Sequence, residues 1–144
     1  MKKVPRLTVD VIIEKNDKIV LIRRKNKPFE GKYALPGGFV EYGEKVEDAA
    51  VREAKEETSL EVKLKEILGV YSEEKRDPRF HSISVVFIAS PLKGRIEAKS
   101  DAEEARWVKL EEINFRELAF DHAKILRDYL NYKKFGGTYW SSKS

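Results

Sequence analysis

The chain has 144 residues, of which 41% are hydrophobic and 38% are charged, and it carries a formal net charge of +4. This length fits one compact domain with its own core. The absence of cysteine excludes disulfide bonds and thiolate metal sites, and we expect a cytoplasmic protein. The apolar runs are too short to span a bilayer, and none follows the basic N-terminus, so we expect neither a membrane anchor nor a signal peptide.

In chain order, the hydrophobic pattern predicts strands that alternate with two helices. A turn at Asn16-Asp17 separates the first two strands, and the first helix is rich in Ala, Glu and Lys. The mixture indicates a single α/β sandwich domain, with a tail that we expect to be loose from about residue 133. The expected strands are 7–14, 18–24, 33–35 (ended by Pro36-Gly37-Gly38), 60–71, 81–89 and 105–108; the expected helices are 44–58, a single turn at 110–113, and 120–132.

A strongly acidic segment interrupts this basic chain. Residues 41–57 contain seven acids and three bases, a net charge of −4, so the rest of the chain carries +8. An acidic locus within a basic protein can hold cations and still attract a polyanionic ligand. The alternative interpretation is one solvated acidic helix. No basic run with interleaved aromatic residues stands out, so we expect no nucleic-acid partner.

The helix predicted over 44–58 places two carboxylates within its apolar face. At about 100° per residue, Glu53 and Glu57 fall in the same narrow arc as Ala50. A buried carboxylate must be protonated, paired with a base or bound to a metal, because burying it alone is costly. Glu56 lies at the edge of this face, and three neighbouring carboxylates favour a hard cation such as Mg²⁺. Pairing with lysines elsewhere in the fold is the alternative.

These glutamates belong to a longer motif, residues 38–60, which resembles the Nudix box. That box reads Gly, five residues, Glu, seven residues, Arg-Glu, an apolar residue, any residue, Glu-Glu, any residue, Gly and an apolar residue. Every fixed position is matched except the last glycine, where Ser59 stands at a helix end that favours glycine. The resemblance implies one Nudix domain over residues 1–144, an α/β/α sandwich with a central mixed sheet.

The same resemblance implies the roles of individual residues. Mg²⁺, or Mn²⁺ in its place, would be the cofactor, Arg52 would orient the catalytic carboxylates, and Glu44 would fix the loop to the helix. Glu104, in the acidic stretch 101–107, is the expected ligand or base from outside the box; a solvated loop glutamate is the alternative. The implied metal ligands are Gly38 through its carbonyl, Glu53, Glu56, Glu57 and Glu104, and the implied catalytic residues are Glu53, Glu57, Arg52 and Glu104.

A second resemblance concerns the substrate. Residues 68–72, 76–79, 81–89 and 118–126 are similar to the ADP-ribose pyrophosphatase branch of the family. This similarity implies hydrolysis of ADP-ribose to AMP and ribose 5-phosphate by a homodimer, with water attacking one phosphorus. Each candidate substrate contact has a surface or structural role as its alternative, and Tyr33 or Phe80 are candidates to stack on a base. The candidate contacts are Arg23, Arg24, Tyr33, Arg76, Arg79 and His81.

Three other functions compete with this interpretation. Another Nudix substrate, such as a dinucleoside polyphosphate, NADH, a nucleotide sugar or an oxidised nucleoside triphosphate, would use the same box. A non-catalytic ADP-ribose sensor is the second; the intact box carboxylates and the roughly twelve residues after the last predicted helix favour an enzyme instead. A structural or RNA-binding domain is the third, and it would leave carboxylates on an apolar helix face unexplained.

Overall fold

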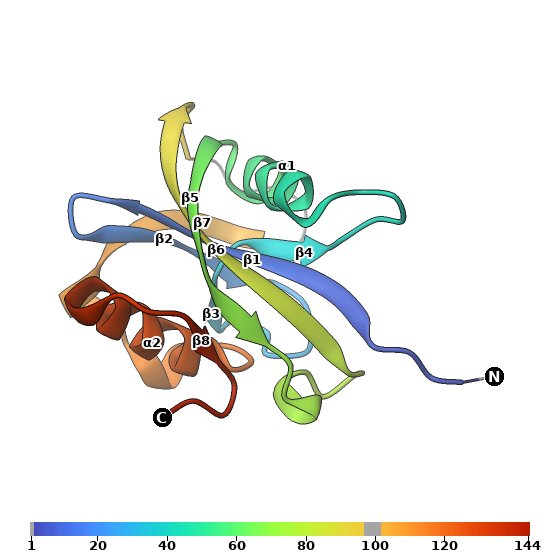
Figure 1. Ribbon diagram of the computed structural model, residues 1–144. Helices are drawn as coiled ribbons and strands as arrows, with labels where there is room; N and C mark the ends of the chain where they lie inside the picture. Colours follow the sequence, from blue (N-terminus) through green and yellow to red (C-terminus); the bar gives the residue numbers. More distant parts are fainter. Residues whose placement is uncertain (1, 97–101) are drawn as a thin grey trace.

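The computed structural model describes residues 2–96 and 102–144, and its centre is a mixed sheet (Figure 1). Within those residues, eight strands form the sheet, with β3, β2, β1, β6, β5 and β8 side by side in that order, β4 paired to β1 and β7 paired to β2. The pairs β1–β6 and β5–β8 are parallel and the others are antiparallel. The strands are β1 (Arg6–Lys15), β2 (Lys18–Arg24), β3 (Tyr33–Ala34), β4 (Gly37–Phe39), β5 (Glu61–Tyr71), β6 (Ser82–Lys93), β7 (Ala102–Lys109) and β8 (Tyr139–Trp140).

Helices α1 (Val46–Thr58) and α2 (His122–Phe135) cover opposite faces of this sheet (Figure 1). The core is therefore divided into a cluster beneath α1, which includes Val9 and Ala50, and a cluster beneath α2, which includes Ile12 and Leu126. This arrangement confirms the expected α/β/α sandwich. Short 3-10 helices lie at Glu74–Arg76, Leu110–Glu112 and Phe115–Glu117.

Strand β1 runs through the middle of the sandwich and supplies side chains to both clusters. Val9, Val11 and Ile13 face α1, whereas Ile12 faces α2, as the alternation of a strand requires. A strand buried on both faces reads as an almost continuous apolar run, as this one does. The predicted turn follows it, with Asn16 and Asp17 at φ of 50° and 62°, values that Asn and Asp tolerate better than most residues.

Two glycines form a strand where the sequence predicted only the end of one. Gly37 and Gly38 belong to β4, which pairs with β1 next to α1. A Cβ atom at Gly37 would lie 2.2 Å from the carbonyl oxygen of Val9, and one at Gly38 would lie 2.1 Å from Oε2 of Glu53. Only glycine therefore lets this backbone pass between β1 and the carboxylate of α1.

Helix α1 ends at the position where the box departs from its usual glycine. Ser59 takes the left-handed conformation, with φ of 69°, and its N–H donates to the carbonyl of Lys55 at 2.8 Å. The Thr58 hydroxyl donates to the Ala54 carbonyl at 2.6 Å and accepts from the Leu60 N–H at 3.1 Å. The helix thus keeps the geometry that favours glycine, at a cost of about 1 kcal/mol.

The C-terminal segment is ordered, so the expectation of a loose tail from residue 133 is wrong. Helix α2 continues to Phe135, and β8 then pairs with β5 at Gly69 and Val70. Tyr139 is 8% exposed and packs in the cluster beneath α2. The strands approach closely because Gly69 has no side chain: a Cβ there would lie 2.0 Å from the Tyr139 carbonyl oxygen.

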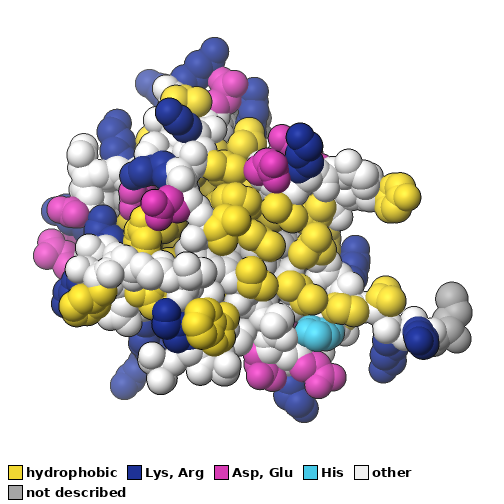
Figure 2. Space-filling model, viewed as in Figure 1, with side chains coloured by type: hydrophobic (Ala, Val, Ile, Leu, Met, Phe, Trp, Pro, Cys, Tyr) yellow, Lys and Arg dark blue, Asp and Glu magenta, His cyan; other side chains and the backbone are white. Residues whose placement is uncertain are grey.

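Part of the sheet face beside α1 is left uncovered. Leu7, Ile67, Val70 and Trp140 are 41–49% exposed, and the strand register places Val70 opposite Val85 and Trp140. Figure 2 shows hydrophobic side chains gathered over the sheet between α1 and the N-terminal end.

None of the described helices combines the length and the apolar character needed to cross a bilayer.

Candidate active site

A cavity of about 440 Å³ lies where β4, α1, β1 and the start of α2 meet. One wall carries the acidic face of α1, with Arg52, Glu53, Glu56 and Glu57. The opposite wall carries polar side chains from β1, β6 and α2, described below. The cavity therefore joins the predicted box residues to a second group that lies far away in the sequence.

The predicted placement of two carboxylates on the buried face of α1 is confirmed. Glu53 and Glu57 are only 9% and 8% exposed, on the same helix face as the buried alanines. Glu56 sits at the edge of this face, with its side chain 50% exposed. Bulk solvent thus reaches Glu56 freely, whereas the other two carboxylates are held at the cavity wall.

Arg52 ties these carboxylates to the loop before the helix. Its Nε and Nη2 donate to the two carboxylate oxygens of Glu44 at 2.8 and 2.9 Å, and Nη2 also donates to the Phe39 carbonyl at 2.9 Å. Its Nη1 donates to Oε1 of Glu53 at 2.7 Å and to Oε2 of Glu56 at 3.2 Å. The hydrogen bonds from Arg52 lower the pKa of Glu44 to about 2, so this forked pair stays ionised.

Burial has the opposite effect on Glu53. Removal from water raises the pKa of Glu53 to about 7, although Arg52 opposes the shift and the neighbouring Glu56 adds to it. One oxygen, Oε1, accepts from Arg52, and the other, Oε2, lies against the Gly38 backbone. A carboxylate held at such a cost is stabilised when a second positive charge lies beside it.

The residues at this wall fit a hard divalent cation. Every donor is an oxygen, from the carboxylates of Glu53, Glu56 and Glu57 and from the backbone brought close at Gly38. Within residues 2–96 and 102–144, no three acidic or histidine side chains converge tightly enough to enclose an ion by themselves. Mg²⁺ can bind at such an open site, because it commonly uses one or two carboxylates and completes its coordination shell with water and substrate phosphates.

The opposite wall is a buried polar network, of which the sequence analysis had named only Arg76. Arg76, 8% exposed, donates to both oxygens of Asp121 at 2.9 and 2.7 Å and to the Ser82 hydroxyl at 2.7 Å. Asp10 accepts from the Ser84 hydroxyl at 2.5 Å. For Asp10, Ser82 and Ser84 the signal in the sequence was a single polar residue within or beside an apolar stretch, and nothing local indicated that these residues meet Arg76 and Asp121.

His122 completes this wall from the first turn of α2. Its Nδ1 accepts from the Leu35 N–H at 3.0 Å, and its Nε2 lies 3.6 Å from Oδ1 of Asp10. Burial lowers the pKa of His122, so the ring is neutral and its single proton is on Nε2. Burial also raises the pKa of Asp10, against the opposing effects of His122, Arg76 and Ser84.

The structure brings three of the six predicted substrate contacts to the cavity. Arg24, Arg76 and Arg79 line it. Arg24 donates to the Pro28 carbonyl at 2.8 Å and lies over the Phe120 ring, 4.9 Å from its centroid. Arg79 is paired with Asp77 at 2.9 Å, and its side chain is 44% exposed.

The other three contacts, and Glu104, lie elsewhere. Arg23 donates to the Gly31 carbonyl at 3.4 Å, and His81 contacts the Ser72 carbonyl through Nε2 at 3.0 Å. The Tyr33 hydroxyl donates to Glu104 at 3.2 Å, so these two side chains satisfy one another on β3 and β7. None of the four is among the described residues that line the cavity, and Asp101, in the same acidic stretch as Glu104, lies outside the described residues.

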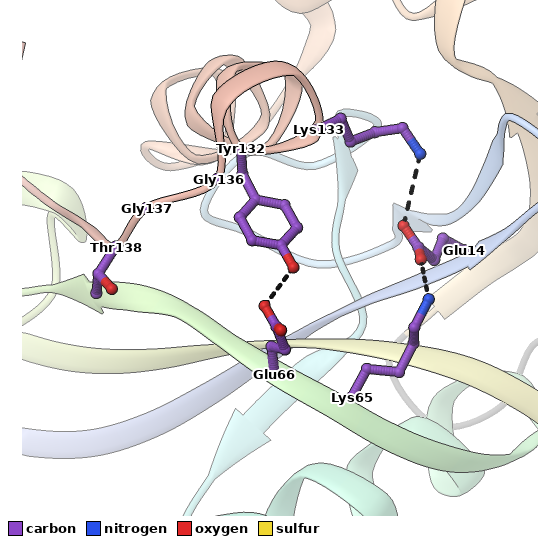
Figure 3. A pocket seen from close by; sticks show the side chains of 8 residues that line it. All are labelled: Glu14, Lys65, Glu66, Tyr132, Lys133, Gly136, Gly137 and Thr138. Carbon is purple, nitrogen blue, oxygen red and sulfur yellow. Dashed lines mark hydrogen bonds and ion pairs between the residues drawn. The ribbon is translucent and has the colours of Figure 1, made fainter.

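A larger hollow, of about 570 Å³, lies at the C-terminal end of α2 (Figure 3). Its charged side chains are already matched: Glu14 lies between Lys65 and Lys133, and the Tyr132 hydroxyl donates to Glu66. It contains no residue of the box, so size alone does not locate the site.

Comparison with known proteins gives the class of this chain. The family model for the NUDIX domain matches residues 4–129, and the chain therefore belongs to the NUDIX family, with the fold and the glutamate-lined cavity of a NUDIX hydrolase. It is 57% identical over 129 residues to an ADP-ribose pyrophosphatase of Methanocaldococcus jannaschii, a match that covers 90% of this chain and 75% of the relative.

Two solved structures with bound ligands share the fold. The NUDIX domain of Shewanella oneidensis NrtR, complexed with ADP-ribose, is 26% identical, with a TM-score of 0.79 and coverage of 92% of this chain and 90% of that one. A bifunctional NMN adenylyltransferase/ADP-ribose pyrophosphatase of Francisella tularensis, with AMP and a manganese ion, is 29% identical, with a TM-score of 0.81. That match covers 90% of this chain but 42% of the bifunctional one.

Proposed function

We propose that this NUDIX hydrolase cleaves the pyrophosphate link of ADP-ribose, giving AMP and ribose 5-phosphate, with Mg²⁺ as its natural cofactor and Mn²⁺ as a substitute. The observation that carries the proposal is the pair Glu53 and Glu57, buried on α1 and turned toward a cavity. The 57% identity to an archaeal ADP-ribose pyrophosphatase supports the substrate.

The residues of the cavity suit the roles that the reaction requires. A divalent cation bound at Glu53, Glu56, Glu57 and the Gly38 carbonyl would lower the pKa of the attacking water and neutralise phosphate charge. Arg52 holds Glu53 in one orientation through the 2.7 Å hydrogen bond from Nη1. A carboxylate fixed in this way accepts a proton within hydrogen-bond reach without first losing side-chain entropy.

Arginines at the rim complement a diphosphate. Arg24 and Arg79 line the cavity from β2 and from the segment before β6. Arg24 donates to the Pro28 carbonyl and Arg79 is paired with Asp77, so both guanidinium groups are held in position to orient the anion. Arg76 is more deeply buried and is committed to Asp121, so we assign it to the architecture of the wall. Glu104 stays a prediction as a ligand or base, because its contacts in this structure are with Tyr33 and Arg106.

Two finer expectations accompany this function. The uncovered apolar sheet face around Ile67, Val70 and Trp140 supports a homodimer, since an exposed apolar surface is an interaction site in many proteins. Light scattering at several protein concentrations tests it. We also propose a cytoplasmic enzyme of small nucleotides, with no nucleic-acid or membrane partner.

The proposal is tested by a substrate panel assayed for AMP and phosphate-ester release. With Mg²⁺, ADP-ribose should be cleaved faster than a dinucleoside polyphosphate, NADH, a nucleotide sugar or an oxidised nucleoside triphosphate. Activity should disappear in EDTA and return with excess Mg²⁺ or Mn²⁺. An ADP-ribose that stays intact while another member of the panel is hydrolysed rapidly would refute the substrate.

The structural similarity to the NrtR domain complexed with ADP-ribose suggests a second candidate function, that of a non-catalytic ADP-ribose sensor. The two functions differ in a single measurement. A sensor binds ADP-ribose in calorimetry but releases no AMP with any divalent metal, whereas the enzyme does both. The three box carboxylates assigned to the metal, Glu53, Glu56 and Glu57, all line one cavity, which favours the enzyme.

A further inference from the structure

Two polar atoms on the wall opposite α1 face one another across a short distance. Oδ1 of Asp10 and Nε2 of His122 are 3.6 Å apart. Both residues line the cavity, although they are only 8% and 3% exposed. A separation of 3.6 Å is too long for a hydrogen bond between the two, so each atom retains hydrogen-bonding capacity toward the cavity.

Each side chain is fixed from behind by another partner. The Ser84 hydroxyl donates to Oδ2 of Asp10 at 2.5 Å, and the Leu35 N–H donates to Nδ1 of His122 at 3.0 Å. Nδ1 is therefore an acceptor and Nε2 carries the proton. The cavity wall thus presents a carboxylate acceptor and an N–H donor side by side, and both side chains are held in place.

The surroundings do not favour a phosphate at this pair. The nearest cation, Arg76, lies 3.8 Å from Oδ2 of Asp10 but gives its two shorter contacts to Asp121, at 2.9 and 2.7 Å. The carboxylate of Asp10 itself repels an anion. Oδ1 also lies close to the backbone of Gly37, since a Cβ there would be 2.5 Å from it. A small neutral polar group is the ligand that this wall suits.

One group can satisfy both atoms at once. An atom that bridges a carboxylate and an N–H donor must donate one hydrogen bond and accept another. A phosphate oxygen only accepts, an aromatic ring nitrogen accepts without donating, and an exocyclic amino group donates; an alcohol hydroxyl does both. We propose that Asp10 and His122 bind a ribose hydroxyl of the substrate and so select for ribose. This inference rests on the proposed function, because it names the part of ADP-ribose that occupies the wall opposite the box.

The first test removes the hydroxyl from the substrate. The wild-type enzyme with Mg²⁺ is assayed on ADP-ribose and on two sets of deoxy analogues. Each analogue of the first set lacks one hydroxyl of the adenosine ribose, and each analogue of the second set lacks one hydroxyl of the terminal ribose. We expect one analogue to lose roughly 10- to 100-fold in kcat/KM, because a site built around a hydroxyl is left with unpaired polar groups when it is absent. The position affected identifies which ribose is bound. Equal rates on every analogue would mean that the pair binds no ribose hydroxyl, and would overturn the inference.

The second test removes one partner from the protein. Asp10→Asn keeps the shape of the side chain and removes the charged acceptor, and His122→Gln keeps a donor near the position of Nε2. On ADP-ribose, Asp10→Asn should lower kcat/KM roughly 10- to 100-fold relative to wild type. On the deoxy analogue the same substitution should lower kcat/KM only slightly, because the hydroxyl that Asp10 would contact is absent. His122→Gln should retain more of the preference than Asp10→Asn. A loss of the same size on ADP-ribose and on the analogue would show that Asp10 serves only the fold.

A matched control is available on the same helix as His122. Asp128 is 4% exposed and accepts from the Tyr71 hydroxyl at 2.8 Å, outside the cavity. Asp128→Asn makes the same chemical change in another buried carboxylate, so it should keep the wild-type preference for ADP-ribose over the deoxy analogue. A preference lost equally in this control would overturn the assignment to Asp10.

A binding measurement separates this inference from the proposed function. The Glu57→Gln protein is titrated with ADP-ribose and with the deoxy analogues in a calorimeter, so that no turnover is needed. We expect the same roughly 10- to 100-fold preference in Kd, abolished when Asp10→Asn is added. If wild-type enzyme releases no AMP but this preference is present, the hydrolase proposal fails and the hydroxyl site stands. If AMP is released and the preference is absent, the reverse holds.

Discussion

The two helices pack on the same sheet, yet their buried faces are built from different residues. Helix α2 presents large apolar side chains such as Ile125 and Leu126, which are at most 1% exposed. Helix α1 packs through three fully buried alanines, and it gives two further buried positions to Glu53 and Glu57. Apart from His122 at its start, α2 thus provides burial for the fold, whereas α1 provides charge at the cavity.

This difference shows how a fold can carry carboxylates on an inner helix face. Alanine side chains let α1 approach β1 and β4 closely, so that Glu53 reaches the Gly38 backbone. The apolar area that α1 forgoes is supplied on the other face, where each fully buried large side chain contributes about 1.5–3 kcal/mol. We therefore expect substitutions in α1 and α2 to affect different measurements, and the following experiments test that separation.

The largest effect is expected for Glu57→Gln in α1. The amide keeps the size of the side chain but removes a carboxylate from the cavity, so kcat should fall by roughly 10²- to 10⁴-fold. Stability should hardly change, because the desolvation of a buried charge is relieved at the same time. Steady-state kinetics with Mg²⁺ and thermal unfolding in EDTA provide the two measurements.

Glu47→Gln serves as the matched control for this change. Glu47 is in the first turn of the same helix, is exposed, and does not line the cavity. Its substitution removes the same charge and should leave kcat at the wild-type value. Near-normal turnover of the Glu57→Gln enzyme would show that the carboxylate of Glu57 is not needed for catalysis, and the proposed difference between α1 and α2 would not hold.

The converse substitution is Leu126→Ala in α2. Leu126 is 1% exposed within the cluster beneath α2, so the cavity left by truncation should lower the free energy of unfolding by about 2–5 kcal/mol. The kcat per folded molecule should not change below the melting transition. Urea unfolding and kinetics on the same preparation decide this, with the exposed Lys134→Ala as control. A large loss of kcat at full folding would show that the apolar face of α2, and not only His122 at its start, shapes the reaction.

The contrast between the helices also explains what could be predicted from the sequence. The acidic face of α1 follows from helical periodicity, which depends only on residues a few positions apart. Glu53 and Glu57 could therefore be placed before the fold was known. Strand alternation was less informative in β2, because the register with β7 shifts between Arg23 and Arg24; both were candidates, and only Arg24 lines the cavity.

Contacts between distant segments could not be predicted in this way. Asp10 and His122 meet because β1 lies at the centre of the sheet and α2 starts beside it, an arrangement set by the whole topology. Glu104 was assigned to the site because residues 101–107 resemble the acidic loop of the family; the register of β7 with β2 places it opposite Arg23, near Tyr33. The order of the tail depends on Tyr139 and on the missing side chain of Gly69.

The smallest effect is expected at the point where α2 is attached to the sheet by charge. Glu14, at the end of β1, accepts from Lys65 at 2.5 Å and from the Tyr129 hydroxyl, and lies 3.8 Å from Lys133 (Figure 3). Burial alone would raise the pKa of Glu14, but the hydrogen bonds from Lys65 and Tyr129 outweigh it and hold the pKa below the ordinary value of 4.5.

The sign of the pH dependence follows from that lowered pKa. The folded state favours the ionised carboxylate, so the contribution of Glu14 is complete above about pH 4.5 and is lost as the pH falls through the folded pKa. Glu14→Gln should therefore cost about 1 kcal/mol at pH 7, and the cost should shrink as the pH falls through the folded pKa of Glu14. Urea midpoints at pH 7, 5, 3 and 2 should converge on the acid side, whereas Glu30→Gln, at an exposed position, should give a curve parallel to wild type. Parallel curves for Glu14→Gln would show that α2 is held by apolar packing alone, and would make its contrast with α1 complete.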